Sequence, residues 1–137
     1  MTVQMTMVCG GERVETSLYV PPGWPEGVRP PGAPEWETTA VAWLLDCCPA
    51  DFRSYPVLRR HPVVLAGFAA QFVESQYRAS RAGLTGVRDS LGDQVPPHVV
   101  ESAVEAWQEQ AAHLVRVRRA VALVEEALRG KVFIRRL

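Results

Sequence analysis

The sequence predicts a mainly α-helical single domain: a long antiparallel helical hairpin, a shorter helix before it and a small β-element. Three observations support this fold class. Apolar residues recur at every seventh position through the last third of the chain, a short turn sequence separates this stretch from another long helical pattern, and the first twenty residues alternate between apolar and polar. The 137 residues are 47% hydrophobic and 22% charged, which is typical of one folded globular domain.

The chain start predicts a β-hairpin in residues 1–20. Apolar and polar residues alternate on both sides of Gly10 and Gly11, and two glycines suit a two-residue turn. With the glycines in the turn, the apolar faces of both strands coincide. The expected pairs are Met7 with Val14, Met5 with Thr16 and Val3 with Leu18.

Residues 21–34 hold six prolines and three glycines around Trp24. This composition predicts an extended or polyproline-like connection across the surface. It has two interpretations: a docking motif for an aromatic-lined groove, or a strap that Trp24 holds against the body of the protein. We favour the strap.

A short helix is expected over residues 35–48. Pro34 suits a first-turn position, and Glu35 and Glu37 would lie near the positive end of the helix dipole. A short irregular or single-turn stretch should then lead to His61.

Two long helices are expected over residues 62–91 and 97–129, each opened by a proline. The first contains Gly83 and Gly86, where a bend is possible. Gly130 is expected to cap the second helix. Because only five residues connect helices of this length, the pair should form an antiparallel hairpin.

The apolar residues of the last helix form one seam: Val100, Trp107, Leu114, Val121 and Leu128. In an antiparallel hairpin this seam would pack on the preceding helix. Charged rows would then face each other, with Arg78, Arg81 and Arg88 opposite Glu109, Glu105 and Glu101, and Glu74 near Arg116. We interpret these rows as interhelical ion pairs rather than as a phosphate-binding row. The β-prone segment 131–137 is expected to add a third strand to the hairpin.

Charge is unevenly distributed. Residues 1–51 carry seven acids and two arginines, a net charge of −5, and residues 52–137 carry +5. Mutual neutralisation of the two parts is our first interpretation. The alternative is a basic surface for nucleic acid or another anionic partner, although a net charge of zero argues against broad nucleic-acid affinity. The candidate contacts are Arg59, Arg60, His61, Arg116, Arg119, Arg135 and Arg136.

The sequence contains no recognisable catalytic, cofactor or metal motif, so we assign no catalytic, cofactor-binding or metal-ligating residue. The three histidines stand far apart and match no zinc spacing. Cys47 and Cys48 are expected to be reduced, buried thiols. A small-ligand or enzyme pocket near Trp36, Trp43 and His61 stays an alternative.

The function that we expect is a non-enzymatic interaction or regulatory role, with the chain forming a homodimer. Apolar stripes on both long helices are wider than a two-helix contact requires. The candidate partner interface is Phe68, Phe72, Val104, Trp107, Leu114 and Val115. No apolar run approaches the ~20 residues of a membrane span, so we expect a cytoplasmic protein without a membrane partner. Fourteen arginines against one lysine are typical of a GC-rich bacterial genome.

Overall fold

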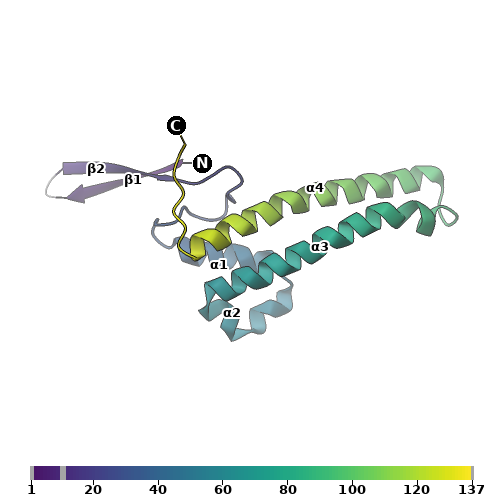
Figure 1. Cartoon of the computed structure of the whole chain (residues 1–137), viewed down its shortest axis with the longest axis horizontal. Helices are drawn as coiled ribbons and strands as arrows, with labels where there is room; N and C mark the ends of the chain where they lie inside the picture. The colour runs from purple at the N-terminus through teal and green to yellow at the C-terminus, as the bar shows by residue number, and fades with distance from the viewer. Residues whose placement is uncertain (1, 10–11, 137) are drawn as a thin grey trace.

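The computed structural model describes the backbone of residues 2–9 and 12–136 and the side chains of residues 18–136. It confirms the predicted fold class: two long antiparallel helices, α3 (Pro62–Leu91) and α4 (Pro97–Leu128), form the hairpin, and the shorter α1 (Trp36–Asp46) precedes them (Figure 1). The bounds of α3 match the prediction, and α4 ends one residue earlier than predicted.

The heptad seam of α4 faces α3, as predicted. Val100, Leu114 and Val121 are buried, and Trp107 and Leu128 are half-buried. The seam therefore packs inside its own chain along the length of the hairpin.

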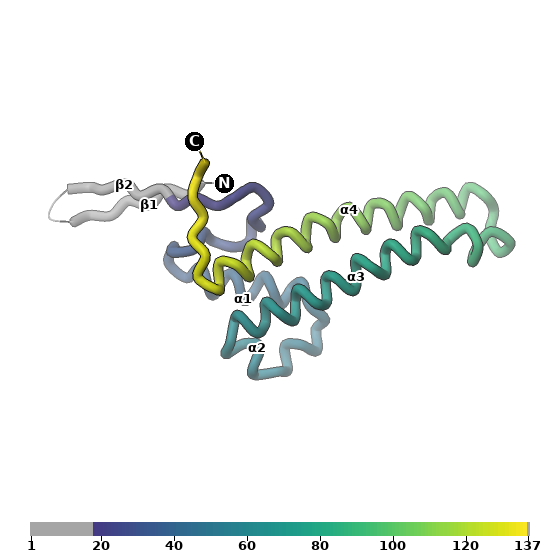
Figure 2. Tube along the Cα trace, in the orientation of Figure 1, coloured from purple at the N-terminus to yellow at the C-terminus, as the bar shows by residue number. Residues whose placement is uncertain are grey.

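A second layer covers only the base of the hairpin, where α3 begins and α4 ends. There α1 packs mainly on α3 and less on α4, and the short helices η1 (Ala50–Ser54) and α2 (Pro56–Arg60) connect it to α3. The stretch over residues 50–61, which was expected to be irregular or a single turn, contains two helices of five residues each. The other half of the hairpin extends away from this base (Figure 2).

The strap (residues 21–34) is a chain of tight turns, which corrects the predicted extended connection. Backbone hydrogen bonds close turns from Trp24 N to Pro21 O and from Ala33 N to Pro30 O, at 3.1 and 3.0 Å. Their third positions, Gly23 and Gly32, have φ of +96° and +89°, which is the type II turn that Pro-Gly favours. A glycine follows each Pro-Pro pair, and its positive φ turns the chain where a polyproline helix would continue.

Trp24 holds the strap to the body, as predicted. Its side chain is 6% exposed, and its indole Nε1–H donates a 2.9 Å hydrogen bond to the carbonyl oxygen of Val28. The ring therefore buries its apolar surface while its one polar group is satisfied within the strap.

The start of α1 differs from the prediction. Pro34 lies in another turn, closed by a 3.2 Å hydrogen bond from Trp36 N to Ala33 O, and not in the first helical turn. Glu35 takes the third position of this turn with a φ of 62°, the left-handed region in which a side chain is strained.

The β-hairpin has the predicted register. Strand β1 (Thr2–Cys9) pairs antiparallel with β2 (Glu12–Tyr19), and Met7 lies opposite Val14, Met5 opposite Thr16 and Val3 opposite Leu18. The predicted Gly10-Gly11 turn lies outside the described residues.

The predicted third strand is wrong, because the described sheet contains β1 and β2 and segment 131–136 does not join it. Gly130, with a φ of +100°, ends α4 through hydrogen bonds from its N–H to Ala127 O and from Lys131 N–H to Glu126 O. Phe133 then contacts Trp24 edge-on, with ring centroids 5.9 Å apart. This contact holds the segment against the strap, where it forms no strand.

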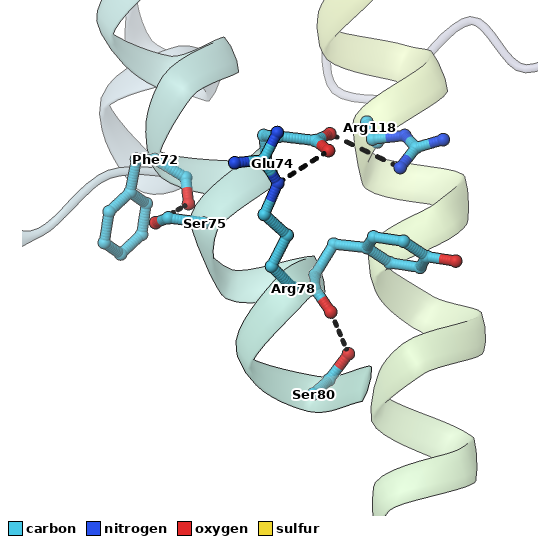
Figure 3. Close-up of polar contacts among 7 residues, drawn as sticks. Phe72, Glu74, Ser75, Arg78, Ser80 and Arg118 are labelled. Carbon is cyan, nitrogen blue, oxygen red and sulfur yellow. Dashed lines mark hydrogen bonds and ion pairs between the residues drawn. The ribbon is translucent and has the colours of Figure 1, made fainter. Parts of the chain in front are cut away.

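The ion pairs between α3 and α4 follow the prediction in part. Arg88 pairs with Glu101 as expected, but Glu74 pairs with Arg118 at 3.3 Å instead of Arg116 (Figure 3). Arg78 lies 3.5 Å from Glu74 on its own helix and not beside Glu109. The Arg118 guanidinium also lies 4.5 Å from the centroid of the Tyr77 ring, whereas Arg116 lines a cleft beside the strap.

Gly83 is required by packing and not by a bend, since α3 continues through it. A Cβ atom on Gly83 would lie 2.4 Å from the Trp107 ring, whereas nothing lies within 4 Å of one on Gly86. The missing side chain of Gly83 therefore provides the space in which Trp107 packs on α3.

These two glycines form a matched pair for mutation. We expect Gly86→Ala to raise the free energy of unfolding by about 0.5–1 kcal/mol, because alanine favours the helix and meets no obstacle. Gly83→Ala should lower it by about 1–3 kcal/mol, because the methyl group collides with Trp107. Urea unfolding followed by circular dichroism measures both, and equal gains in stability would contradict the packing role of Gly83.

The strain at Glu35 gives another prediction. Glu35→Gly should be more stable to unfolding than Glu35→Gln by about 1 kcal/mol, because both lose the charge and only glycine adopts the positive φ without a Cβ clash. Gly32→Ala should lose about 1 kcal/mol at the equivalent turn position. Thermal melts of the three variants test this, and a glutamine variant as stable as the glycine variant would show that the turn is unstrained.

Candidate interaction surfaces

The six residues of the predicted partner interface do not form one surface. Leu114 is 3% exposed and belongs to the core, so its assignment to an interface is wrong. Val104 and Trp107 are half-buried on α4, where Trp107 packs on α3. Leu114 was expected both in the seam that packs on the preceding helix and in the partner interface, and its burial agrees with the first placement.

The remaining residues lie on two separate surfaces. Phe68 of α3 is 43% exposed, and Phe72, one turn further along, is half-buried beside it. Val115 of α4 is 47% exposed and lies beside the strap. Phe68 and Phe72 therefore mark one candidate surface, and Val115 marks another.

Four aromatic rings form the first surface, which we call the aromatic patch: Phe52, Tyr55, Phe68 and Phe72. Phe52 of η1 is at its centre, with ring centroids 6.0 Å from Tyr55, 5.7 Å from Phe68 and 6.2 Å from Phe72. A shallow depression of about 590 Å³ runs between Phe52, Phe68 and Phe72. Sequence periodicity could not identify Phe52 and Tyr55, because Phe52 lies in the five-residue helix η1 and Tyr55 is the residue between η1 and α2.

Apolar exposure concentrates around this patch. Of the ten large apolar residues that are exposed in the described part of the chain, five lie within residues 55–68: Tyr55, Val57, Val63, Val64 and Phe68. Val64, Phe68 and Phe72 are four residues apart and share one face of α3. A contiguous apolar surface of this kind is typical of a contact site.

The candidate basic residues divide between two regions. Arg59, Arg60 and His61 are exposed where α2 meets α3, at the edge of the base. On α4, Arg119 lines a depression together with Arg136, and it also lines a separate cleft with Arg116. The basic residues therefore do not form a single phosphate-binding row.

The Arg135 guanidinium lies 5.6 Å from the centroid of the Tyr19 ring, and Tyr19 also lines the depression that contains Arg119 and Arg136. The predicted neutralisation of the two oppositely charged parts is slight. Among the described residues, Asp46 pairs with Arg53 at 2.6 Å, while Glu26, Glu35 and Glu37 have no cation within 4.0 Å.

Trp36, Trp43 and His61, which were expected near one pocket, lie in three different places. Trp36 lines a depression beside segment 130–135, and His61 is exposed at the start of α3. Trp43 lines a cleft of about 750 Å³ between the strap, α1 and α4, which we call the strap cleft. Its lining includes Gly23, Pro25, Glu26, Gly27, Trp43, His113, Val115, Arg116, Val117 and Arg119.

Neither a metal cluster nor a membrane span is found in the described residues. No group of three or more His, Cys, Asp or Glu side chains there could hold a metal ion. Within the same residues, no helix has the length and apolar character to cross a membrane. Comparison with family models, curated proteins and solved structures finds no match.

Cys47 and Cys48 are free, half-buried thiols that pack against the core at the end of α1. Burial raises the pKa of Cys47 from its ordinary 9.0 to about 11, with smaller contributions from Cys48 and Asp46. Burial also raises the pKa of Cys48, and the nearby Arg53 opposes that shift. These thiols are poor nucleophiles at neutral pH.

The shifted pKa predicts an alkaline dependence of stability. Because the folded-state pKa of Cys47 lies above its unfolded value, the thiol stabilises the fold below pH 9.0, and this contribution is lost as pH rises toward about 11. The free energy of unfolding of Cys47→Ala should therefore fall less between pH 9.0 and about 11 than that of the native protein.

Iodoacetamide labelling read by mass spectrometry gives a second test of the burial of Cys47. The reagent should modify Cys47 far more slowly in the folded than in the urea-unfolded chain, and equal rates would contradict its burial.

Proposed function

We propose that this chain is a non-enzymatic interaction protein that forms a homodimer through the aromatic patch. The observation that carries the proposal is the cluster of Phe52, Tyr55, Phe68 and Phe72, which is exposed at its edge and presented by helices that pack firmly on the hairpin. Aromatic residues on a rigid support bury a large area at little entropic cost, and they are enriched at protein interfaces.

The chemistry of the patch supports contact with a second copy of itself. Residues near a two-fold axis lie close to the same residues of the partner, so like charges near the centre of such an interface would repel each other. The depression at the centre is lined by Phe52, Gly67, Phe68, Gln71 and Phe72, none of which is charged. Arg53, which follows Phe52 on η1, is paired with Asp46. An uncharged centre allows self-association without desolvating an unpaired ion.

We further propose that the homodimer acts in the cytoplasm of a bacterium. Free thiols at Cys47 and Cys48 suit a reducing compartment. The part of the hairpin that extends beyond the base would remain available to other partners in such a dimer (Figure 1).

The test is the oligomeric state of a charge variant. We expect the native chain to be a dimer at micromolar concentration in light scattering or sedimentation. Phe68→Asp should raise the dissociation constant of the dimer at least tenfold. Phe68 is 43% exposed, so the fold should tolerate the change.

Val132→Asp is the matched control, because Val132 is 79% exposed on segment 131–136 and gains the same charge. It should leave the dimer intact. A monomeric native chain, or equal disruption by both variants, would overturn the proposed dimer.

A further inference from the structure

The strap cleft combines an aromatic wall with a cationic edge, and we propose that it binds a small organic monocarboxylate that has an aromatic or acyl body. The cleft lies between the strap, α1 and α4, apart from the aromatic patch. The inference therefore does not depend on the proposed homodimer.

The apolar part of the cleft can hold the body of such a ligand. Trp43 is half-buried, and Val117 and Pro25 line the cleft with it. A Cβ on Gly27 would lie 3.4 Å from Trp43 Cδ1, in van der Waals contact. The absence of a side chain at Gly27 leaves this edge of the indole uncovered. The volume of about 750 Å³ falls within the range of small-molecule sites, about 300–1,000 Å³.

The cationic part comes from two successive turns of one helix face. Arg116 and Arg119 are three residues apart on α4 and line the same cleft. No carboxylate among the described residues lies within 4.0 Å of either guanidinium. Arg119 Nε is 3.1 Å from the position that a Cβ on Gly23 would occupy, so this side chain lies across a turn of the strap.

The balance of charge selects the ligand. Two arginines and Glu26 line the cleft, and their charges sum to +1. One carboxylate would neutralise this charge, whereas a phosphate dianion would leave an excess. Guanidinium groups bind carboxylates through paired N–H donors, and an apolar body attached to the carboxylate would reach the Trp43 ring.

The first experiment uses the native chain with 2-naphthoate and its neutral analogue 2-naphthalenemethanol as probes. We expect 2-naphthoate to produce saturable shifts of the Trp43 indole N–H and the Gly23 and Gly27 amides in ¹⁵N-correlated NMR spectra. The neutral alcohol should bind at least tenfold more weakly. Equal binding of both probes, shifts confined to Gly67 and Phe68 at the aromatic patch, or no saturable shift at millimolar probe would each overturn the proposal.

The second experiment removes the charges. Arg116→Gln combined with Arg119→Gln should weaken 2-naphthoate binding at least tenfold while leaving the circular dichroism spectrum unchanged. Arg59→Gln combined with Arg60→Gln is the matched control, because it removes two adjacent exposed arginines from α2. Similar losses in both double variants would show that general positive charge, and not the strap cleft, attracts the probe.

Discussion

Burial of the α4 seam against α3 is the interaction on which the rest of the structure depends. Leu114 and Val121 of α4 share one core with Leu65 and Val73 of α3, and a fully buried aliphatic side chain contributes about 1.5–3 kcal/mol. At the base of the hairpin, α1 covers the apolar surface that α3 and α4 form together. The packing of α1 in turn places Trp43 beside the strap. Both candidate surfaces are therefore held in position by the packing of the two long helices.

Trp24 is the second organising contact, and it links segments that are far apart in the sequence. Its indole hydrogen bond to Val28 closes the strap on itself, and its ring edge meets Phe133 beyond the end of α4. The turns of the strap present Gly23 and Gly27 toward Arg119 and Trp43. Because the strap is compact and pinned, it forms one wall of a cleft instead of a flexible connection.

The two candidate surfaces could be predicted from the sequence to different degrees. Helical spacing identified Phe68 and Phe72, since residues four apart share a face of a long helix. It could not identify Phe52, because the ring reaches them through tertiary packing of a five-residue helix without periodicity. The sequence also drew attention to Trp43 and Arg119 separately. Only the fold brings them to one cleft, because α4 is far in the sequence from the strap and α1.

By itself, the sequence determined the elements and their pairing: the bounds of α3, the antiparallel hairpin and the register of the β-strands all follow from periodicity and turn residues within short stretches. Tertiary structure alone decided what each face contacts. Leu114 and Trp107 belong to the same seventh-residue series, yet Leu114 lies in the core and Trp107 is half-buried where it packs on Gly83. The β-prone segment after α4 is held by the contact of Phe133 with Trp24 and does not join the sheet. Local patterns specify which residues share a face, but burial depends on which partner surface arrives there, and that is a property of the whole chain.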